Sequence, residues 1–460
     1  MNLSRRQIPA FLFRPRNLAP TILRPAPENE ASLVTLSDGT TRLFYMKRNE
    51  AVCSIDSLDE GRTWTAERRE FPVPGHTAHA CVALLDSRRE LHVFFLVIRG
   101  MGTRLNIDRF IDIFHVRTNN GSWLPPDRIW DGYCGSLRAA IETRRGRIVL
   151  PFASWTAGRP AAPPVGSNEV TAIYSDDFGA SWRQSPSGLT SPCREDYNGS
   201  NYGAVEPCLV ELPTRRLWML MRTQTGALYE SFSNDGSEWT PAAASPFHSS
   251  NSPAALLRLR DHAIVLAWNN CLPPPKHGGQ GVYGGRDALH IAISRDNART
   301  WRGFREIYLD PTRNQTPPQR GDRATAYPFL AETRTGHILL TTGQGERRRA
   351  VLRFHPEWLL ATTHQSTFDP NAPDWSTFES FGPARNYWRD RRIGPAATWN
   401  FPSLHRGTLD ITLDGEATAT LTDHFQDPAE QAPGCIQLAI AGPRVTMRWD
   451  SSGLRAPRAI

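Results

Sequence analysis

One short pattern occurs six times along the chain and limits the folds that it can adopt. Each copy begins with a polar residue, continues through an apolar strand and a polar turn, and ends in a second apolar strand. Residues 206–222 show the pattern most clearly, with the turn at 213–216. Leu217, Met219 and Met221 recur at every second position, a spacing that predicts a half-buried strand. The pattern therefore predicts an antiparallel hairpin in every copy.

The spacing of the six copies is typical of propeller blades. A four-stranded blade occupies about 40–50 residues, and longer spacings leave room for inserted loops. Successive copies start 46 to 75 residues apart. We therefore predict an all-β protein with a six-bladed β-propeller. The copies begin at Glu30, His79, Arg138, Glu206, Ser252 and Tyr327.

A second motif, Ser-x-Asp-x-Gly-x-Thr/Ser-Trp, lies at the far turn of several copies. We expect its aspartate to accept backbone N–H groups within the turn, while its tryptophan packs between sheets. This favours a structural role, without calcium and without catalysis. The motif occupies residues 57–64, 175–182, 294–301 (with Ala for Gly), 233–239 (one residue shorter) and, in degenerate form, 118–123.

Charge and cysteine content narrow the range of partners. The 460 residues carry a net charge of +7, and Lys47 and Lys276 are the only lysines. The basic residues are dispersed among 46 acidic ones, which favours a solvated surface over a nucleic-acid stripe. The seven cysteines have no metal-ligand spacing, so we expect reduced thiols and no cofactor. Without an apolar leader or a membrane-length segment, the expectation is a cytoplasmic protein with no membrane partner.

Three regions follow from these patterns. We expect an N-terminal extension at 1–24, the propeller at 25–365 and a β-rich accessory region at 366–460. Strand-like alternation in the last region indicates a short β-sandwich. Residues 455–460 have no convincing strand pattern, so this sandwich is expected to be incomplete or to lean on the propeller.

The six residues that open the copies are expected to form a ring. In a propeller the inner strands of all blades start around one central opening, and polar groups that converge on one concave point indicate a site. The alternative is a set of hydrogen bonds within a water-filled channel. Ser252 suits a structural role, and His79 suits either.

The Ser-x-Asp-x-Gly-x-Thr/Ser-Trp motif is that of the Asp-box, and together with six blades it resembles the sialidase (neuraminidase) superfamily over roughly residues 25–360. The resemblance implies a tyrosine nucleophile activated by a glutamate. The segment around Glu206, with Arg222 at the end of the following strand, resembles the one that supplies the glutamate and a substrate arginine. The segment 326–330 resembles the one that supplies the tyrosine, here Tyr327. A neutral nucleophile suits an anionic substrate, and the glutamate would withdraw the phenolic proton, whose pKa is ordinarily about 10.

The resemblance also implies three arginines that bind the substrate carboxylate. Arg222 and Arg286 match two of them, although Arg286 could instead pair with Asp287. Glu30 stands where the first arginine is expected, which leaves Arg138 or Arg48 as replacements. A carboxylate at position 30 would repel a sugar carboxylate by about 1–4 kcal/mol at partial exposure.

The general acid of the family has no obvious counterpart. It normally lies on a long loop of the first blade, and here that connection is only residues 47–50. Glu30 and His79 are the ring residues that could replace it, and Asp108 and Asp131 are the candidates in the insertions.

The leading hypothesis is an exo-acting, retaining glycoside hydrolase of sialidase type that removes a terminal, sialic-acid-like sugar, so its expected partner is a carbohydrate substrate. A polysaccharide lyase, with His79 and Tyr327 as base and acid, is the second hypothesis. A carbohydrate-binding propeller without activity is the third. Trp155, Tyr202 and Tyr283 would either stack on a sugar or pack within the fold.

Overall fold

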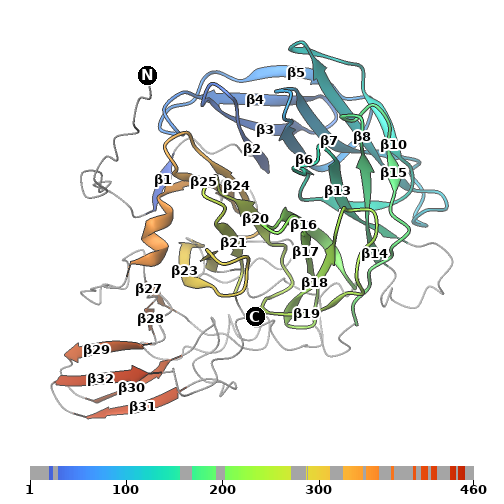
Figure 1. The fold of residues 1–460 in the computed structure, drawn as a ribbon. Helices are drawn as coiled ribbons and strands as arrows, with labels where there is room; N and C mark the ends of the chain where they lie inside the picture. Colours follow the sequence, from blue (N-terminus) through green and yellow to red (C-terminus); the bar gives the residue numbers. More distant parts are fainter. Residues whose placement is uncertain are drawn as a thin grey trace, which may run out of the picture.

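Six antiparallel sheets arranged around one axis form the body of the protein in a computed structural model (Figure 1). The prediction of an all-β fold with a six-bladed propeller is confirmed. The residues that the structure describes are 20–23, 30–155, 168–192, 203–270, 286, 288–310, 325–344, 349–361, 375–377, 397–399, 406–412, 416–421, 436–441 and 444–450.

Each blade has its inner strand nearest the axis, and in the first five blades the main strands follow outwards in chain order; in blade six the outermost strand is β1. Blade one consists of β2 (Ala31–Thr35), β3 (Thr41–Lys47), β4 (Ala51–Ser57) and β5 (Arg68–Pro72). Blade two consists of β6 (Thr77–Leu85), β7 (Leu91–Arg99), β8 (Phe110–Asn119), β9 (Ser122–Trp123) and β10 (Asp127–Trp130). Blade three consists of β11 (Cys134–Leu137), β12 (Ile141–Glu142), β13 (Ile148–Trp155), β14 (Asn168–Ser175) and β15 (Arg183–Gln184).

The second half of the propeller has the same design. Blade four consists of β16 (Val205–Glu211), β17 (Leu217–Arg222), β18 (Ala227–Ser233) and β19 (Ala243–His248). Blade five consists of β20 (Ala255–Arg258), β21 (Ile264–Trp268), β22 (Ala288–Ser294) and β23 (Arg302–Leu309). Blade six consists of β24 (Phe329–Glu332), β25 (Ile338–Thr342), β26 (Ala350–Phe354) and β1 (Thr21–Leu23), and the short 3-10 helix η1 (Pro356–Leu360) follows it.

Strand β1 closes the ring. It pairs antiparallel with β26, with Thr21 opposite Arg353 and Leu23 opposite Val351. The sequence placed these residues in an N-terminal extension outside the propeller, because three residues carry too little periodicity to predict a strand. They instead form the outer edge of blade six, which joins the start of the chain to the last blade.

The second strand of each blade is more deeply buried than its alternation predicted. All six residues of β17 are buried. Leu217, Met219 and Met221 pack against blade three, whereas Trp218 and Leu220 pack against blade five. The prediction of a half-buried strand was therefore wrong, because the two neighbouring blades cover both faces of β17.

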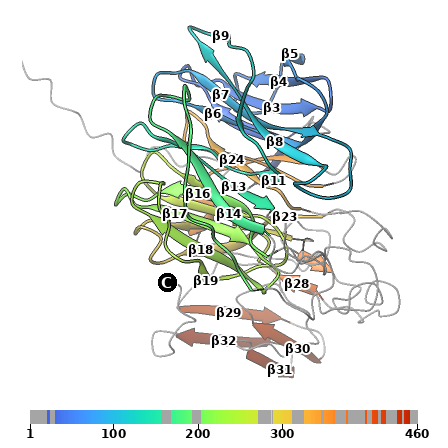
Figure 2. The ribbon, with the colours of Figure 1, turned by 90° about the vertical axis from the view of Figure 1, so that its right-hand side faces the viewer.

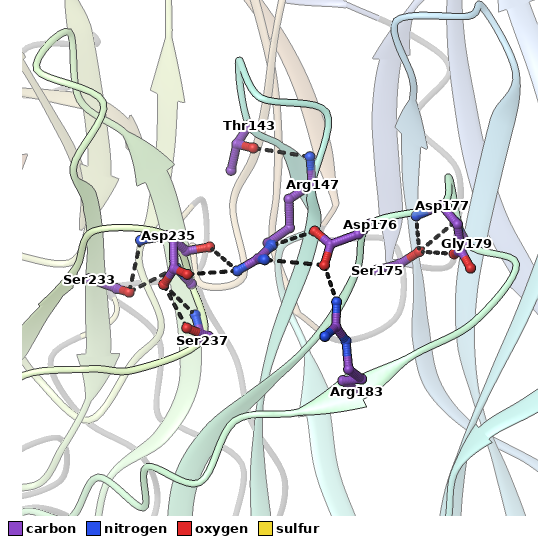
Figure 3. Close-up of polar contacts among 11 residues, drawn as sticks. Thr143, Arg147, Ser175, Asp176, Asp177, Gly179, Arg183, Ser233, Asp235 and Ser237 are labelled. Atoms are coloured by element: carbon purple, nitrogen blue, oxygen red, sulfur yellow. Dashed lines mark hydrogen bonds and ion pairs between the residues drawn. The ribbon is translucent and has the colours of Figure 1, made fainter.

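The aspartate of the second motif closes its turn as predicted. Asp177 accepts hydrogen bonds from the Ser175 hydroxyl at 2.7 Å, the Ser181 N–H at 2.8 Å and the Ser181 hydroxyl at 2.5 Å. Asp59 and Asp296 make the same three kinds of bond. Figure 3 shows the turn of blade three and the shorter turn of blade four, in which Asp235 accepts from the Ser237 N–H at 3.0 Å and the Ser237 hydroxyl at 2.7 Å.

An arginine joins those two turns. Arg147 binds Asp176 beside the blade-three turn at 2.6 Å and Asp235 of the blade-four turn at 2.9 Å (Figure 3). The tryptophans of the motif pack on the preceding blade, as when Trp182 of blade three lies edge-on to Phe94 of blade two at 5.5 Å. These contacts confirm the structural role of the motif and make it a link between blades.

We expect Asp177→Ala to lower the free energy of unfolding by about 1–2 kcal/mol at neutral pH, because the turn loses its shared acceptor. Partial burial raises the pKa of Asp177, but the bonds from Ser181 and Ser175 outweigh this and bring it to about 2. The stabilisation is therefore complete above the ordinary value of 3.8 and is lost as the pH falls through about 2. Urea unfolding at several pH values measures it, with Asp131→Ala, an exposed aspartate, as the control. Equal losses in both variants would contradict the role of the turn.

The accessory region contains the strands that the alternation predicted. Strand β29 (Arg406–Thr412) pairs with β32 (Arg444–Asp450), and β30 (Glu416–Leu421) pairs with β31 (Ile436–Ala441). The pair of β27 (Trp375–Thr377) and β28 (Ala397–Trp399) precedes them. Figure 2 shows β29 to β32 as a group of their own, and residues 455–460 lie outside the described part of the chain.

Cys53, Cys81, Cys134 and Cys208 are buried free thiols, which confirms the expectation for these four. Cys193, Cys271 and Cys435 lie outside the described residues. Among the described residues, no helix is long and apolar enough to cross a membrane, and no group of three or more ligand-type side chains is placed to hold a metal ion.

Candidate functional site

The inner strands surround the centre of the propeller, as β2, β6, β16, β20 and β24 do in Figure 1. Glu206 lies in β16, and Tyr327 precedes β24 by two residues. Both have a positive φ, 48° for Glu206 and 61° for Tyr327, a backbone conformation that non-glycine residues rarely adopt. Strand β16 also shifts register between Val205 and Cys208, so that Glu206 lies in a bulge. Bulges and positive φ values of this kind aim side chains and concentrate at functional sites.

Glu206, Arg222 and Tyr327 form one hydrogen-bonded cluster. The Tyr327 hydroxyl donates to Glu206 Oε1 at 3.3 Å. Arg222 Nη1 donates to Glu206 Oε2 at 2.6 Å and to Tyr327 Oη at 3.2 Å. Glu206 and Tyr327 lie 121 residues apart in the sequence. The fold thus brings a carboxylate and a guanidinium of blade four to a phenol of blade six.

Asn251 holds two arginines beside this cluster. Its side-chain oxygen accepts from Arg222 Nε at 2.5 Å, and its backbone carbonyl accepts from Arg286 Nε at 3.2 Å. Arg286 Nη1 also donates to Gln344 at 2.7 Å, and its guanidinium lies 5.6 Å from the centre of the Tyr327 ring. The structure therefore brings both predicted substrate arginines to Tyr327.

Arg138 and Glu30 form an ion pair next to the ring of Tyr327. The Arg138 side chain is 1% exposed and also donates to the Pro328 carbonyl at 3.0 Å. Glu30 is 18% exposed and lines a small pocket together with Tyr327 and Arg349. Glu30 is thus placed to meet a ligand in that pocket, whereas Arg138 lies behind it as the buried partner.

The charge states of the cluster follow from burial and from the arginines. Burial raises the pKa of Glu206, but Arg222, Arg138 and Arg286 outweigh this, and the net pKa lies below its ordinary value of 4.5. Burial lowers the pKa of Arg138 to about 10, although Glu206 and Tyr327 oppose the shift. Burial lowers the pKa of Arg349 to about 10 as well. At neutral pH the site therefore holds an ionised glutamate among charged arginines.

Other predicted residues lie away from the cluster or cannot be placed in it. Ser252 donates to Asn269 at 2.5 Å, a buried bond that supports the structural role. His79 lies in β6, but its side chain is outside the described residues. Asp108 is bound by Arg104 at 2.7 Å. Arg48 and Asp131 are exposed, and Asp287, Tyr202 and Tyr283 are not among the described residues. Trp155 ends β13 and its carbonyl accepts from Asn106.

Three residues of the site were not predicted from the sequence. Asn251 precedes the fifth copy of the repeat by one position, and only its neighbour Ser252 was considered. Gln344 follows β25, and Arg349 precedes β26. Gln344 and Arg349 lie between the second and third strands of blade six, and Asn251 lies just before the first strand of blade five. The polar residues of these two connections were the signal that could have revealed them.

A comparison with protein families decides which family this chain represents. Residues 73–340 match the BNR repeat-like domain. The chain is a member of the BNR repeat-like domain family. No curated protein matches the chain.

Two solved structures share the fold of this BNR repeat-like protein. One is a protein of unknown function from Dyadobacter fermentans, with 16% identity and a TM-score of 0.52 over 74% of this chain and 99% of that one. The other is a Hadza microbial sialidase, with 16% identity and a TM-score of 0.53 over 72% of this chain and 66% of that one. At this identity the likeness shows that the fold is that of the sialidases, as the sequence resemblance indicated.

Proposed function

We propose that the protein is a retaining glycoside hydrolase of sialidase type, with Tyr327 as nucleophile and Glu206 as its base. The observation that carries the proposal is the contact of 3.3 Å between the Tyr327 hydroxyl and Glu206, with Arg222 bound to both. A carboxylate within hydrogen-bond reach of a nucleophile, and oriented by a third group, is the arrangement that covalent catalysis requires.

The first step forms a glycosyl–tyrosine bond. Tyr327 Oη attacks the anomeric carbon while Glu206 takes the phenolic proton, and the bond from that carbon to the leaving oxygen breaks. Glu30, in its protonated form, is the candidate that gives a proton to the leaving oxygen, because it lines the same pocket as Tyr327. Its ionised form is the one that pairs with Arg138. In the second step water attacks the same carbon and gives a proton to the Glu30 carboxylate, while the phenolate leaves and takes its proton back from Glu206.

The charges around Tyr327 favour an acidic sugar. Arg222 and Arg286 both reach the tyrosine, and guanidinium groups bind carboxylates through paired hydrogen bonds. Glu30 opposes a second carboxylate in the pocket, since like charges repel at short range. We therefore expect a terminal sugar with one carboxylate, held on the side of Arg222 and Arg286 and away from Glu30.

A panel of α-linked aryl glycosides, sialic acid included, tests the proposal through release of the aryl group. We expect turnover of an acidic sugar by the wild-type protein. Products with a new double bond would indicate a lyase instead, and binding without any product would indicate a carbohydrate-binding propeller. Either result would overturn the proposal that the protein is a hydrolase.

The acidic limb of kcat/KM is expected to lie below pH 4.5, because the pKa of Glu206 is lowered from that value. The limb reports the free enzyme's base, and the rate falls as that base gains a proton. A pH series with the best glycoside of the panel measures the limb. A midpoint above 4.5 that persists in Glu30→Gln would contradict the assignment of Glu206 as the base.

A further inference from the structure

Arg138 has a position that the proposed reaction does not use. Its guanidinium carbon lies 5.0 Å from the centre of the Tyr327 ring and 4.3 Å from that of Phe329. Both distances are within the range of about 6 Å at which a cation attracts the face of an aromatic ring. A positive charge is therefore buried on the face of the proposed nucleophile.

Three contacts keep this guanidinium in place. Glu30 binds one end of it, the Pro328 carbonyl accepts from the other at 3.0 Å, and the ring of Phe329 covers it. Pro328 follows Tyr327 directly, so the arginine is tied to the backbone of the residue whose ring it covers. With 1% of its side chain exposed, Arg138 cannot reach a ligand without breaking these contacts.

Other charged groups surround Tyr327, some at its hydroxyl and one over its ring. Glu206 and Arg222 both touch the hydroxyl and form an ion pair with each other. Arg286 lies 5.6 Å from the ring centre, and Arg349 lines the pocket. Arg138 lies closer to the ring centre than Arg286 does, 5.0 Å against 5.6 Å, and the partly exposed carboxylate of Glu30 is its ion-pair partner.

We propose that Arg138, held by Glu30, is a positioning residue that stabilises the phenolate form of Tyr327. A phenolate spreads its negative charge over the ring, so the guanidinium attracts the charged ring more strongly than the neutral one. A nearby opposite charge favours ionisation and lowers a pKa. The inference rests on the proposed function only for the role of this phenolate. Negative charge develops on the tyrosine oxygen as it loses its proton during attack on the sugar, and the phenolate is the leaving group when water releases the sugar.

The titration of Tyr327 in the free protein tests this inference without any substrate. The protein has ten tyrosines, so the phenol of residue 327 is followed by ring-labelled tyrosine NMR and assigned by its loss in Tyr327→Phe. We expect Arg138→Met, which keeps the length of the side chain without its charge, to raise the pKa of Tyr327 by about 1–3 units. An unchanged pKa in a folded variant would overturn the inference.

Arg305→Met is the matched control. Arg305 is buried, its guanidinium lies 3.8 Å from the centre of the Trp358 ring, and it donates to the Trp358 carbonyl at 2.8 Å. It therefore reproduces the burial and the ring contact of Arg138 outside the site. We expect Arg305→Met to leave the Tyr327 titration unchanged. An equal rise in both variants would show a loss of packing rather than a local charge and would overturn the inference.

The double variant Arg138→Met/Glu30→Gln separates the arginine from its counter-ion. If the guanidinium acts directly, the pKa of Tyr327 stays raised when Glu30 is also neutralised. If the rise comes only from a released Glu30 carboxylate, the double variant returns to the wild-type value, which would overturn the inference. Should Arg138→Met fail to fold, two other variants replace it. We expect Arg138→Lys, which keeps the charge, to change the pKa of Tyr327 little, and we expect Glu30→Gln, which removes the counter-ion, to lower it.

This test and that of the proposed function can fail separately. A raised pKa in Arg138→Met together with full turnover by Tyr327→Phe would support the charge effect and refute the nucleophile. An unchanged pKa together with loss of turnover in Tyr327→Phe would refute the charge effect and support the nucleophile.

Discussion

Tyr327→Phe is expected to lower kcat by about 10³-fold or more on the glycoside that the wild-type protein turns over best. The substitution removes one oxygen, and with it the only atom of this side chain that can form a bond to the sugar. The ring stays in place, so the contacts with Arg138 and Arg286 are retained. We expect little change in KM or in thermal stability, because the loss concerns the reacting atom. Release of the aryl group under saturating substrate measures the effect.

Tyr45→Phe is the matched control for this prediction. The Tyr45 hydroxyl donates to Glu67 at 2.6 Å, so this residue is also a phenol bound to a glutamate, but it lies in β3 of blade one. We expect it to retain wild-type turnover. Retention of wild-type turnover by Tyr327→Phe would remove the tyrosine from the reaction.

Glu206→Gln is expected to lower kcat by about 10²–10⁴-fold, the range that a general base contributes. The amide oxygen can still accept from Arg222, but it cannot take the phenolic proton. The neutral side chain also leaves the buried guanidinium of Arg222 without its ion-pair partner, which destabilises the site. We therefore expect a lower melting temperature as well, and single-turnover kinetics on folded protein separate the two effects.

Glu211→Gln provides the control at the opposite end of the same strand. Glu211 is a buried carboxylate bound to Arg258 at 2.9 Å, so its loss disturbs an ion pair of the same kind far from Tyr327. We expect it to lower the melting temperature and to leave kcat unchanged. Equal kcat values in Glu206→Gln and Glu211→Gln would show that Glu206 has no chemical role.

Repetition made the fold predictable from the sequence. Six spaced hairpins with polar starts predict six blades, and the same alignment places Glu206 and Tyr327 at equivalent positions. The aspartate turns were predictable because Asp177 and Ser181 belong to one local motif whose bonds span only four residues. Local periodicity was therefore enough to predict the architecture and to place the two central residues of the site, Glu206 and Tyr327, at equivalent positions.

Contacts between distant segments could not be predicted in the same way. The pairing of Thr21 with Arg353 depends on closure of the ring, and a three-residue strand has no usable period. The placement of Arg138 behind Glu30 is also a long-range result, because 108 residues separate them. The sequence offered Arg138 as a substrate ligand, whereas the structure places it as a buried partner of Glu30. Asn251 escaped notice because an amide carries no charge signal.

Trapping of the covalent intermediate tests the central claim most directly. A fluorinated form of the best sugar, with a good leaving group, slows release of the sugar more than its attachment, so the glycosyl-enzyme accumulates. We predict that mass spectrometry of the digested protein finds one sugar on the peptide that contains Tyr327, attached to the tyrosine oxygen, and finds none in Tyr327→Phe. A sugar attached to Glu206 or Glu30, or a protein that turns over the parent glycoside with inversion at the anomeric carbon, would contradict the account.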